Sequence, residues 1–195
     1  MITFYHAPHS RSWRILALIE EMGLGDRIDL RAVNILRADG SGGRDPANPH
    51  PEGKVPILDH DGRLISETPA IMIYLTTLFP GSTMAPAPGT PDWGVFLSWM
   101  CWYTAAMEPA LLTAMAGASH PVLYSTWRDP QAVTDRLRAA LDGRPWIMGE
   151  SYSAVDLLLH SPYAWVPDLM PDDPAIRDWV ARCQARPVTQ ATYTA

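Results

Sequence analysis

Hydrophobic and polar positions follow two different patterns along this chain of 195 residues. In the first part, apolar runs of strand length at residues 2–5, 28–33 and 55–58 are separated by turns or by a helical stripe. That stripe, from residue 11 to residue 22, places apolar side chains at helical spacing. Two strands joined by one such helix predict a parallel, right-handed crossover.

The pattern next predicts a hairpin followed by a helix. After the run at 55–58, His60-Asp61-Gly62 is a turn signal, and residues 64–65 resume an apolar strand. Thr68 is then expected as the N-cap of a helix over 69–78, with proline at its first position. The predicted element order is β-α-β-(α)-β-β-α.

Residues 79–91 carry four prolines and two glycines, which predicts a linker. Beyond it the pattern favours helices alone, with Pro109 as a kink or local break in the first of them. Ser153 and Asp156 form a capping box at the start of the third. The expected helices span residues 92–115, 126–141, 153–166 and 174–185. The fold class is therefore α/β followed by all-α, with domains at 1–79 and 92–195.

Composition narrows the classes of function. The net charge is −6, and no basic run or stripe is present, so a nucleic-acid partner is not expected. No apolar run reaches membrane-spanning length and no signal-peptide pattern is present, so we expect a cytoplasmic protein without a membrane partner. Cys101 and Cys183 lie far apart with no partner at metal or redox spacing, which predicts buried thiols and no metal.

The pattern Asn48-Pro49-x-x-x-Gly-Lys-Val-Pro56, followed by Glu67-Thr68, resembles the glutathione-binding half of the glutathione S-transferases. The Ser-x-x-Asp box at 153–156 and the tail from Trp179 to Pro187 resemble the helical half of the same family. The resemblance covers nearly the whole chain. It implies a thioredoxin-like N-terminal domain, an all-helical C-terminal domain, a homodimer, and glutathione as cosubstrate without a metal.

The resemblance also assigns glutathione-binding residues. Glu67 would pair with the ligand ammonium, and Thr68 would receive a carboxylate at the positive end of a helix. The Val55-Pro56 bond would be cis, with the main chain of Val55 pairing like an added strand. Lys54 would meet the carboxylate at the glycine end. Simpler alternatives remain open: Thr68 only caps, Glu67 only complements the helix dipole, Lys54 is a solvated surface residue and His50 is either a ligand contact or part of the loop.

Activation of the thiol needs a hydrogen-bond donor. Lowering a thiol pKa of about 8.5 by two units takes about 2.7 kcal/mol, which one donor and a helix N-terminus can supply. Three residues match positions that the family uses: Ser10, Tyr5 and Ser12. Ser10 is favoured, as a donor and not as a nucleophile, since no base stands at triad spacing. The alternative is that Ser10 only caps the helix.

The second substrate is expected to be a small apolar electrophile. Four residues of the first long helix are candidates for its pocket: Trp99, Trp102, Tyr103 and Met107. An aromatic stripe at helical spacing equally suits a core or a dimer interface. The sequence thus predicts a glutathione transferase of the detoxification type. The alternatives are another glutathione-dependent enzyme on the same fold, such as an isomerase or a peroxidase, and a binding module without catalysis.

Overall fold

The computed structural model describes residues 1–192, and the chain in it divides into two compact units. One unit comprises Met1–Pro80 together with the described residues from Pro187 onward, and the other comprises Gly81–Arg186. The predicted linker therefore spans the point at which the first unit ends. The predicted domain limits, 1–79 and 92–195, stay a prediction, because this division describes packing alone.

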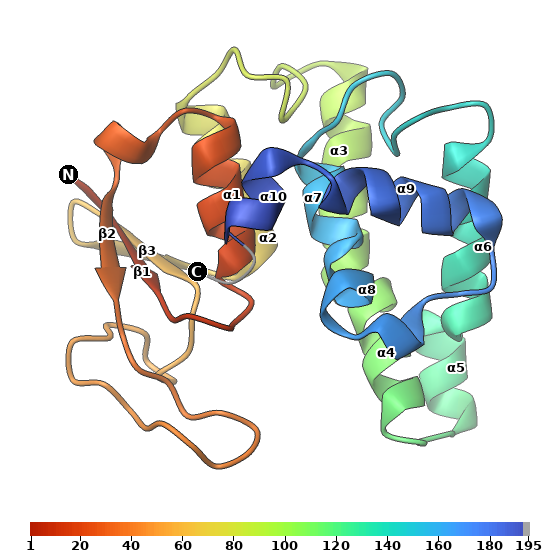
Figure 1. Cartoon of the computed structure of the whole chain (residues 1–195), viewed down its shortest axis with the longest axis horizontal. Coiled ribbons are helices and arrows are strands. Elements are labelled where there is room, and N and C mark those ends of the chain that lie inside the picture. Colours follow the sequence, from red (N-terminus) through yellow and green to blue (C-terminus); the bar gives the residue numbers. More distant parts are fainter. Residues whose placement is uncertain (193–195) are drawn as a thin grey trace. The chain divides into compact units, whose positions relative to one another are not determined.

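A four-stranded mixed sheet forms the centre of the first unit, in the order β2-β1-β3-β4 (Figure 1). Its strands are β1 (Ile2–His6), β2 (Asp29–Ala32), β3 (Ile57–His60) and β4 (Arg63–Ser66). β1 and β2 are parallel, as the crossover predicts, whereas β3 is antiparallel to both β1 and β4. Asp61 and Gly62, with φ of 50° and 80°, make the predicted two-residue hairpin turn.

Three helices accompany the sheet: α1 (Trp13–Glu21), α2 (Thr68–Leu78) and α10 (Pro187–Thr192). α1 packs against α2 and α10, and α2 packs against β4, all on one side of the sheet (Figure 1). Phe4 and Leu58 are paired neighbours on β1 and β3 and are fully buried with Ile15, Leu18 and Ile71. The apolar stripe of α1 therefore packs with α2 on one face of the sheet and buries the central strands. The predicted thioredoxin-like order of elements is confirmed.

The second unit is helical. Its helices are α3 (Pro91–Trp102), α4 (Glu108–Met115), α5 (Pro121–Trp127), α6 (Pro130–Leu141), α7 (Ala154–Leu159), α8 (Ser161–Trp165) and α9 (Pro174–Gln184). Short 3₁₀ turns occur at Gly25–Arg27 in the first unit and at Pro167–Leu169 here. Phe96, Met100, Leu137, Leu158 and Trp179 are fully buried in its core. Within residues 1–192 no named strand follows Ser66, so the predicted all-helical second part is confirmed.

Proline divides two of the predicted helices. The helix expected over 126–141 is interrupted between α5 and α6, where Arg128 has a φ of 67° and Asp129 is extended before Pro130. A residue before proline disfavours the helical conformation, and Asp129 caps α6 by accepting from the N–H of Ala132 at 2.9 Å. The helix expected over 153–166 is similarly divided into α7 and α8 near Pro162.

The helix expected over 92–115 is continuous but not uniform. A π-helical turn over Tyr103–Met107 joins α3 to α4, immediately before Pro109. In a regular α-helix the ring of Pro109 would collide with the carbonyl four residues earlier, and its missing N–H would leave that carbonyl unpaired. The wider π turn is the local break that was predicted, as the alternative to a kink, at Pro109.

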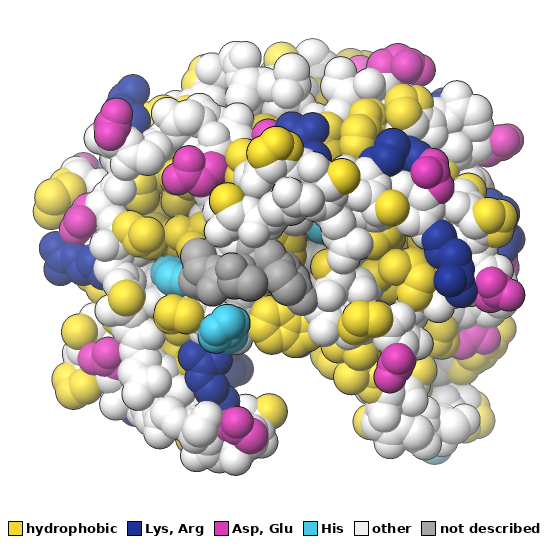
Figure 2. Space-filling model, in the orientation of Figure 1, with side chains coloured by type: hydrophobic (Ala, Val, Ile, Leu, Met, Phe, Trp, Pro, Cys, Tyr) yellow, Lys and Arg dark blue, Asp and Glu magenta, His cyan; other side chains and the backbone are white. Residues whose placement is uncertain are grey.

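The described residues contain no helix long and apolar enough to cross a membrane. On the face drawn in Figure 2, Lys and Arg side chains are interspersed with Asp and Glu side chains. This distribution accompanies a net charge of −6 over the sequence.

Candidate functional site

Two of the three candidate activating residues meet in the loop between β1 and α1. The Oγ atoms of Ser10 and Ser12 lie 2.6 Å apart, and both side chains are buried. The hydroxyl of Ser10 donates to the carbonyl of Ala7 at 2.7 Å, and Ser12 Oγ lies 2.8 Å from Nδ1 of His6. Ser12 is the N-cap residue of α1, so both hydroxyls stand at the positive end of that helix.

Ser10 also contributes to the start of the helix, as the alternative interpretation expects. Its Oγ accepts from the N–H of Ser12 at 3.3 Å, and its carbonyl accepts from the N–H of Trp13 at 3.3 Å. The regular helix begins at Trp13, two residues later than predicted. Capping and a role toward a ligand are compatible, because the hydroxyl proton of Ser10 is directed elsewhere, to Ala7.

Tyr5, the third candidate, is not brought together with the two serines. Successive side chains of a strand point to opposite faces, so Tyr5 lies on the opposite face of β1 from His6. Tyr5 is buried in a small apolar cluster with Val33 and Ile57, against which Val55 also packs. The choice among the three residues stays a prediction, and their geometry separates Tyr5 from the other pair.

The segment before Ser10 is held from a distance by Arg37. Its guanidinium donates through Nη2 to the carbonyl of Pro8 at 2.8 Å and through Nη1 to the carbonyl of His9 at 3.1 Å. Arg37 belongs to the long connection between β2 and β3, which Figure 1 shows extending away from the sheet. One planar fork therefore ties that connection to the loop that carries Ser10.

The approach to β3 has the conformation that the resemblance implies. The Val55-Pro56 peptide bond is cis. Among the described residues, none makes a hydrogen bond to the main-chain N–H or carbonyl of Val55. Upstream, the amide of Asn48 donates from Nδ2 to the carbonyl of Lys54 at 3.1 Å. This contact, which the sequence did not single out, fixes the turn that precedes Val55.

His50 is engaged within the same loop. Its N–H donates to Oδ1 of Asn48 at 3.0 Å, and its Nδ1 accepts from the N–H of Glu52 at 3.0 Å. The side chain is buried. These contacts agree with the structural alternative for His50, while its contact with glutathione stays a prediction.

Glu67 has a backbone conformation that is costly for a glutamate. Its φ is 70° and its ψ is 123°, and it occupies the N-cap of α2, so the predicted cap, Thr68, is instead the first helical residue. Non-glycine residues in such regions cost about 1–3 kcal/mol and are concentrated at functional sites. The side chain of Glu67 is exposed, whereas Thr68 is buried at the positive end of the helix.

Charges gather between this helix end and the loop of Lys54. The pKa of Lys54 is raised by its hydrogen bond with Glu52 and by that carboxylate's charge; Glu67 adds to the rise and Arg11 opposes it. The Lys54–Glu52 pair spans 2.5 Å, and both side chains are exposed. The same contact lowers the pKa of Glu52. Lys54 is thus paired in the absence of ligand, and Arg11 is a second cation in its vicinity.

The four residues predicted to line a substrate pocket have two different environments. The rings of Trp99 and Trp102 meet edge-on at 5.3 Å, and the guanidinium of Arg136 from α6 lies over both, at 4.6 and 4.4 Å from their centroids. Tyr103 and Met107 are buried on the π turn, where the hydroxyl of Tyr103 donates to Oε1 of Glu108 at 2.9 Å. Their role as a pocket stays a prediction.

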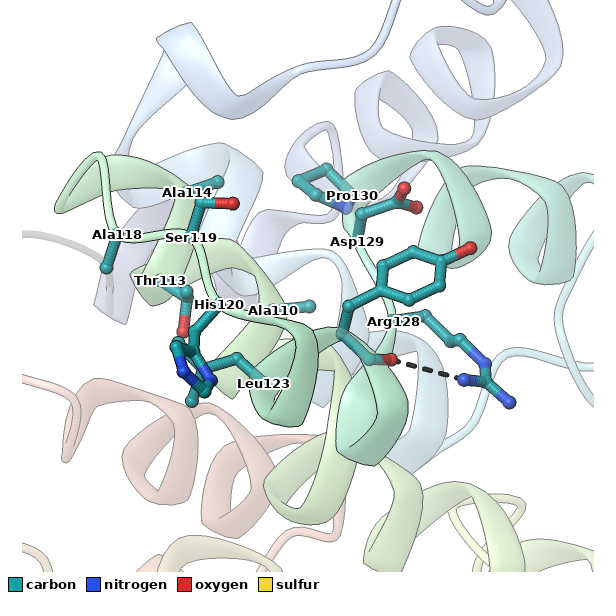
Figure 3. Close-up of a pocket in the computed structure, with 11 residues that line it drawn as sticks. Ala110, Thr113, Ala114, Ala118, Ser119, His120, Leu123, Arg128, Asp129 and Pro130 are labelled. Atoms are coloured by element: carbon teal, nitrogen blue, oxygen red, sulfur yellow. Dashed lines mark hydrogen bonds between the residues drawn. The ribbon is translucent and has the colours of Figure 1, made fainter.

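Two hollows in the helical unit are lined by other residues. One, of about 110 Å³, lies between α4, the start of α5 and the start of α6 (Figure 3). Arg128 at its rim donates to the carbonyl of Tyr124 at 3.2 Å, which satisfies part of its guanidinium. The other, of about 260 Å³, is lined by residues 83–92 and 148–153. None of the predicted site residues lines either hollow.

This chain is similar to known proteins in both sequence and fold. Residues 10–78 match the model of the glutathione S-transferase N-terminal domain. The structure of a glutathione transferase from Methylococcus capsulatus aligns over 99% of this chain and 97% of its own, with a TM-score of 0.77 and 27% identity. Residues 10–78 therefore resemble the N-terminal domain of the glutathione S-transferases, and nearly the whole chain shares its fold with a glutathione transferase.

Other proteins similar to this chain carry names for different activities. The disulfide-bond oxidoreductase YfcG of Escherichia coli is 27% identical over 97% of this chain and 93% of its own. A sphingomonad glutathione S-transferase solved in complex with glutathione shares the fold, with 24% identity, a TM-score of 0.74 and coverage of 98% and 96%. A disulfide-bond oxidoreductase and glutathione transferases therefore both occur among the proteins similar to this one.

Metal binding has no structural support in residues 1–192, which contain no group of three or more His, Cys, Asp or Glu side chains arranged to hold an ion. The predicted absence of a metal stays a prediction. Three supporting residues were not among the predicted site residues. His6 contacts the side chain of Ser12, Arg37 donates to the carbonyls of Pro8 and His9 before Ser10, and Asn48 donates to the carbonyl of Lys54. Two of them left a signal in the sequence: Asn48 begins the quoted pattern, and strand alternation sets His6 beside Phe4.

Proposed function

We propose that this protein binds glutathione, stabilises its thiolate and transfers it to an apolar electrophile. The observation that carries the proposal is the hydroxyl of Ser10. It is buried at the positive end of α1, and its proton rests on a carbonyl acceptor from which it can turn to a ligand. The family relationship supports glutathione binding, and the arrangement of Ser10 supports activation of the thiol.

The proposed contacts divide the tripeptide among the elements of the first unit. Glu67 pairs with the γ-glutamyl ammonium, and the N-terminus of α2 with Thr68 receives the γ-glutamyl carboxylate. The main chain of Val55 pairs with the cysteinyl backbone. Lys54 exchanges Glu52 for the glycine carboxylate. The costly backbone of Glu67 favours this assignment, since the fold tolerates that conformation at a place where it serves a ligand.

Activation follows from differential stabilisation of the thiolate. A hydroxyl that donates to sulfur stabilises the charged form far more than the neutral thiol, and each pKa unit corresponds to about 1.4 kcal/mol. Ser10 and the end of α1 together supply the order of magnitude needed to make the thiol largely ionised near neutral pH. The thiolate then attacks the electrophile, and the protein's contribution is positioning and charge stabilisation.

We further propose that Trp99, Trp102, Tyr103 and Met107 contact the apolar part of the electrophile. The Trp pair beside Arg136, of which Trp102 is half-buried, supports an apolar contact with a nearby cation. The same residues suit a core or an interface between subunits. Trp102→Ala raising KM for apolar substrates more than for polar ones, at unchanged affinity for glutathione, is the result that favours the pocket.

The decisive experiment measures the pKa of the glutathione thiol in the complex, by the ultraviolet absorbance of the thiolate across a pH series. Ser10→Ala is expected to raise that pKa by about one unit or more and to reduce turnover at pH 7. Glutathione affinity should stay nearly constant, because the other contacts of the tripeptide remain. Tyr5→Phe is the matched control, since it also removes one hydroxyl.

Two results contradict the assignment. If Tyr5→Phe raises the thiol pKa and Ser10→Ala does not, activation belongs to the tyrosine. If no variant changes it and no electrophile is consumed, the protein is a glutathione-binding module.

A second candidate function is the glutathione-dependent reduction of disulfides, which the relationship to YfcG favours. In that reaction the thiolate of glutathione attacks one sulfur of a disulfide, and the other sulfur leaves as a thiolate and takes a proton from solvent. Of the two free cysteines, Cys101 is exposed, contrary to the prediction that both thiols are buried, whereas burial raises the pKa of the Cys183 thiol. The chain has serine at position 10, so in this proposal glutathione itself supplies the attacking thiolate. Parallel assays with a mixed disulfide and with an aromatic halide decide between the two reactions.

We also propose a cytoplasmic homodimer that acts without nucleic acid, membrane or metal, in the detoxification of electrophiles. Sedimentation velocity tests the dimer, since a monomer at micromolar concentration contradicts it. Metal analysis of the purified protein and unchanged activity after dialysis against a chelator test the absence of a metal.

A further inference from the structure

The side chains of His6, Ser12 and Ser10 form an unbroken row of hydrogen bonds that ends at the main chain of Ala7. The row runs from Nδ1 of His6 to Oγ of Ser12 at 2.8 Å, from there to Oγ of Ser10 at 2.6 Å, and from there to the carbonyl oxygen of Ala7 at 2.7 Å. The N–H of Ala7 also donates to Oγ of Ser12, at 3.3 Å. All three side chains are buried, with exposed fractions of 4%, 0% and 8% along the row.

The direction of these bonds follows from the supply of protons. A carbonyl oxygen has no proton, so Ser10 must donate to Ala7. Its single proton is then used, so the contact between the two serines is donated by Ser12. The proton of Ser12 is used in turn, so Nδ1 of His6 must donate to Ser12. Only this direction gives each of the three short contacts a proton.

This direction separates the arrangement from that of a nucleophilic serine. In a serine–histidine pair, the ring nitrogen accepts the hydroxyl proton and the serine oxygen attacks. Here the ring donates, and each oxygen accepts from the residue behind it. Such a chain strengthens the donor at its end, because every bond polarises the next one in a largely buried site.

We propose that His6 and Ser12 are positioning residues that aim the hydroxyl of Ser10 at the sulfur of bound glutathione. This inference rests on the proposed function. When the thiolate binds, the O–H of Ser10 turns from the carbonyl of Ala7 to the sulfur, while its oxygen continues to accept from Ser12. The thiol proton passes to solvent, and Ser10 keeps its own proton. One hydrogen bond is exchanged for another, and no covalent bond to the protein forms.

The fold explains why His6 and Ser12 can do this. His6 is the last residue of β1 and lies on the same face of that strand as Phe4, the face that the helices cover. Ser12 is the N-cap residue of α1, and its carbonyl accepts from the N–H of Ile15 at 3.0 Å. A strand and a helix thus fix the two rear members of the row, and only Ser10 lies in the connecting loop.

The test measures the thiol pKa of bound glutathione in His6→Leu, which removes the donor, and in His6→Asn, which can place an amide N–H where Nδ1 stands. We expect His6→Leu to raise the thiol pKa by about half a unit to one unit, which corresponds to roughly a three- to tenfold fall in the acid dissociation constant of the bound thiol. In His6→Asn the thiol pKa should stay close to its wild-type value, because the amide N–H replaces the lost donor. Affinity for S-methylglutathione, which has no thiol to ionise, should change less than about twofold.

A second comparison separates this inference from a purely structural role. In a Ser10→Ala background, adding His6→Leu should leave the thiol pKa where Ser10→Ala alone puts it, because His6 acts only through Ser10. If His6→Leu fails to fold, Ser12→Ala serves in its place, with the same expected shift and the same dependence on Ser10.

The outcomes separate the positioning role of His6 and Ser12 from activation of the thiol by Ser10. If Ser10→Ala raises the thiol pKa while His6→Leu and Ser12→Ala leave it unchanged, the positioning inference is overturned and the proposed function stands. An equal rise from His6→Leu with and without Ser10 also overturns it. If Ser10→Ala itself has no effect, activation by Ser10 fails and the inference fails with it.

Discussion

The starts of α1 and α7 both carry a buried network built around serine, and the two networks end differently. At α7, one carboxylate receives every bond: Asp156 accepts from the N–H of Ile147 at 2.9 Å, from the N–H and hydroxyl of Ser153 at 3.0 Å, and from Nε1 of Trp179 at 3.0 Å. Four donors converge on two oxygens, and the capping box predicted from the sequence is confirmed.

At α1 no carboxylate is present, and each hydroxyl passes a bond onward. The row ends on the carbonyl of Ala7, an acceptor that Ser10 can leave when a better one arrives. The difference shows what a buried carboxylate and a row of hydroxyls are each suited to do. A buried anion fixes its donors and has nothing left to offer a ligand, whereas a chain of hydroxyls keeps one proton that can be redirected.

The largest expected effect is on stability, in Asp156→Asn. The amide replaces one of the two acceptor oxygens by a donor, which faces donors that are already buried, so we expect a loss of about 3 kcal/mol in the free energy of unfolding. Urea unfolding measures it. Asp172→Asn, on an exposed carboxylate, is the control and should change stability by less than about 0.5 kcal/mol. A loss under about 1 kcal/mol in Asp156→Asn would show that the network at α7 is as adaptable as the one at α1.

The next effect is on binding, in Glu67→Ala. Losing a charge-assisted contact with the ligand ammonium should weaken glutathione binding by about 2 kcal/mol, or roughly thirtyfold, as measured by calorimetry. Glu67→Gly should weaken binding equally, yet unfold with about 1 kcal/mol more stability than Glu67→Ala, because glycine accepts a φ of 70° without strain. Unchanged affinity in both variants removes Glu67 from the site.

A third prediction concerns Asp173, a carboxylate cap that is simpler than Asp156. It accepts from the N–H of Ile176 at 3.0 Å and from Nε of Arg138 at 2.5 Å. Asp173→Ala should cost about 1 kcal/mol at neutral pH, measured by urea unfolding.

The pH dependence of that loss has a definite sign. The hydrogen bond from Ile176, and then that from Arg138, lower the pKa of Asp173 below its ordinary value. A depressed folded-state pKa contributes stability above the unfolded pKa of about 3.9, and that contribution is lost as the pH falls through the folded-state pKa. The difference between the wild type and Asp173→Ala should therefore shrink below about pH 4. A difference that grows on acidification would contradict the assignment.

The smallest expected effect is that of Ser10→Ala on stability. Ser12 Oγ lies 3.3 Å from the carbonyl of Ala7 and can turn its own proton there, so the loss should stay under about 1 kcal/mol in the free energy of unfolding. A loss as large as that of Asp156→Asn would mean that the row at α1 is structural. In Ser10→Ala, the pKa of the bound thiol should therefore change while the free energy of unfolding changes little, whereas Asp156→Asn should mainly lose stability.

Much of the fold was predictable because it depends on local spacing. The strands, the Asp61-Gly62 turn and the linker follow from alternation, turn residues and proline, all within about ten positions of one another. The errors also have local causes. Pro130 and Pro162 divide predicted helices, and the positive φ of Glu67 moves the cap of α2 one residue away from Thr68.

The candidate site was predictable in its residue types but not in its connections. The pattern from Asn48 to Thr68 pointed to glutathione, and the sequence favoured Ser10 over Tyr5 and Ser12. The structure added the face of the sheet, which puts Tyr5 in an apolar cluster, and the distance from Ser12 to His6. Arg37 was out of reach altogether, since it is 28 and 29 positions from the carbonyls that it holds.

The sequence by itself determined the order of the elements, the family resemblance and the capping box of Asp156, because each is set by side chains that are neighbours along the chain or along one helix. Only the tertiary structure shows how the hydroxyls of Ser10 and Ser12 are connected to His6. It brings the last residue of β1 against the N-cap residue of α1, and it directs each proton by the acceptor nearest to it. Burial of that row makes its direction matter, since water would otherwise replace every bond in it.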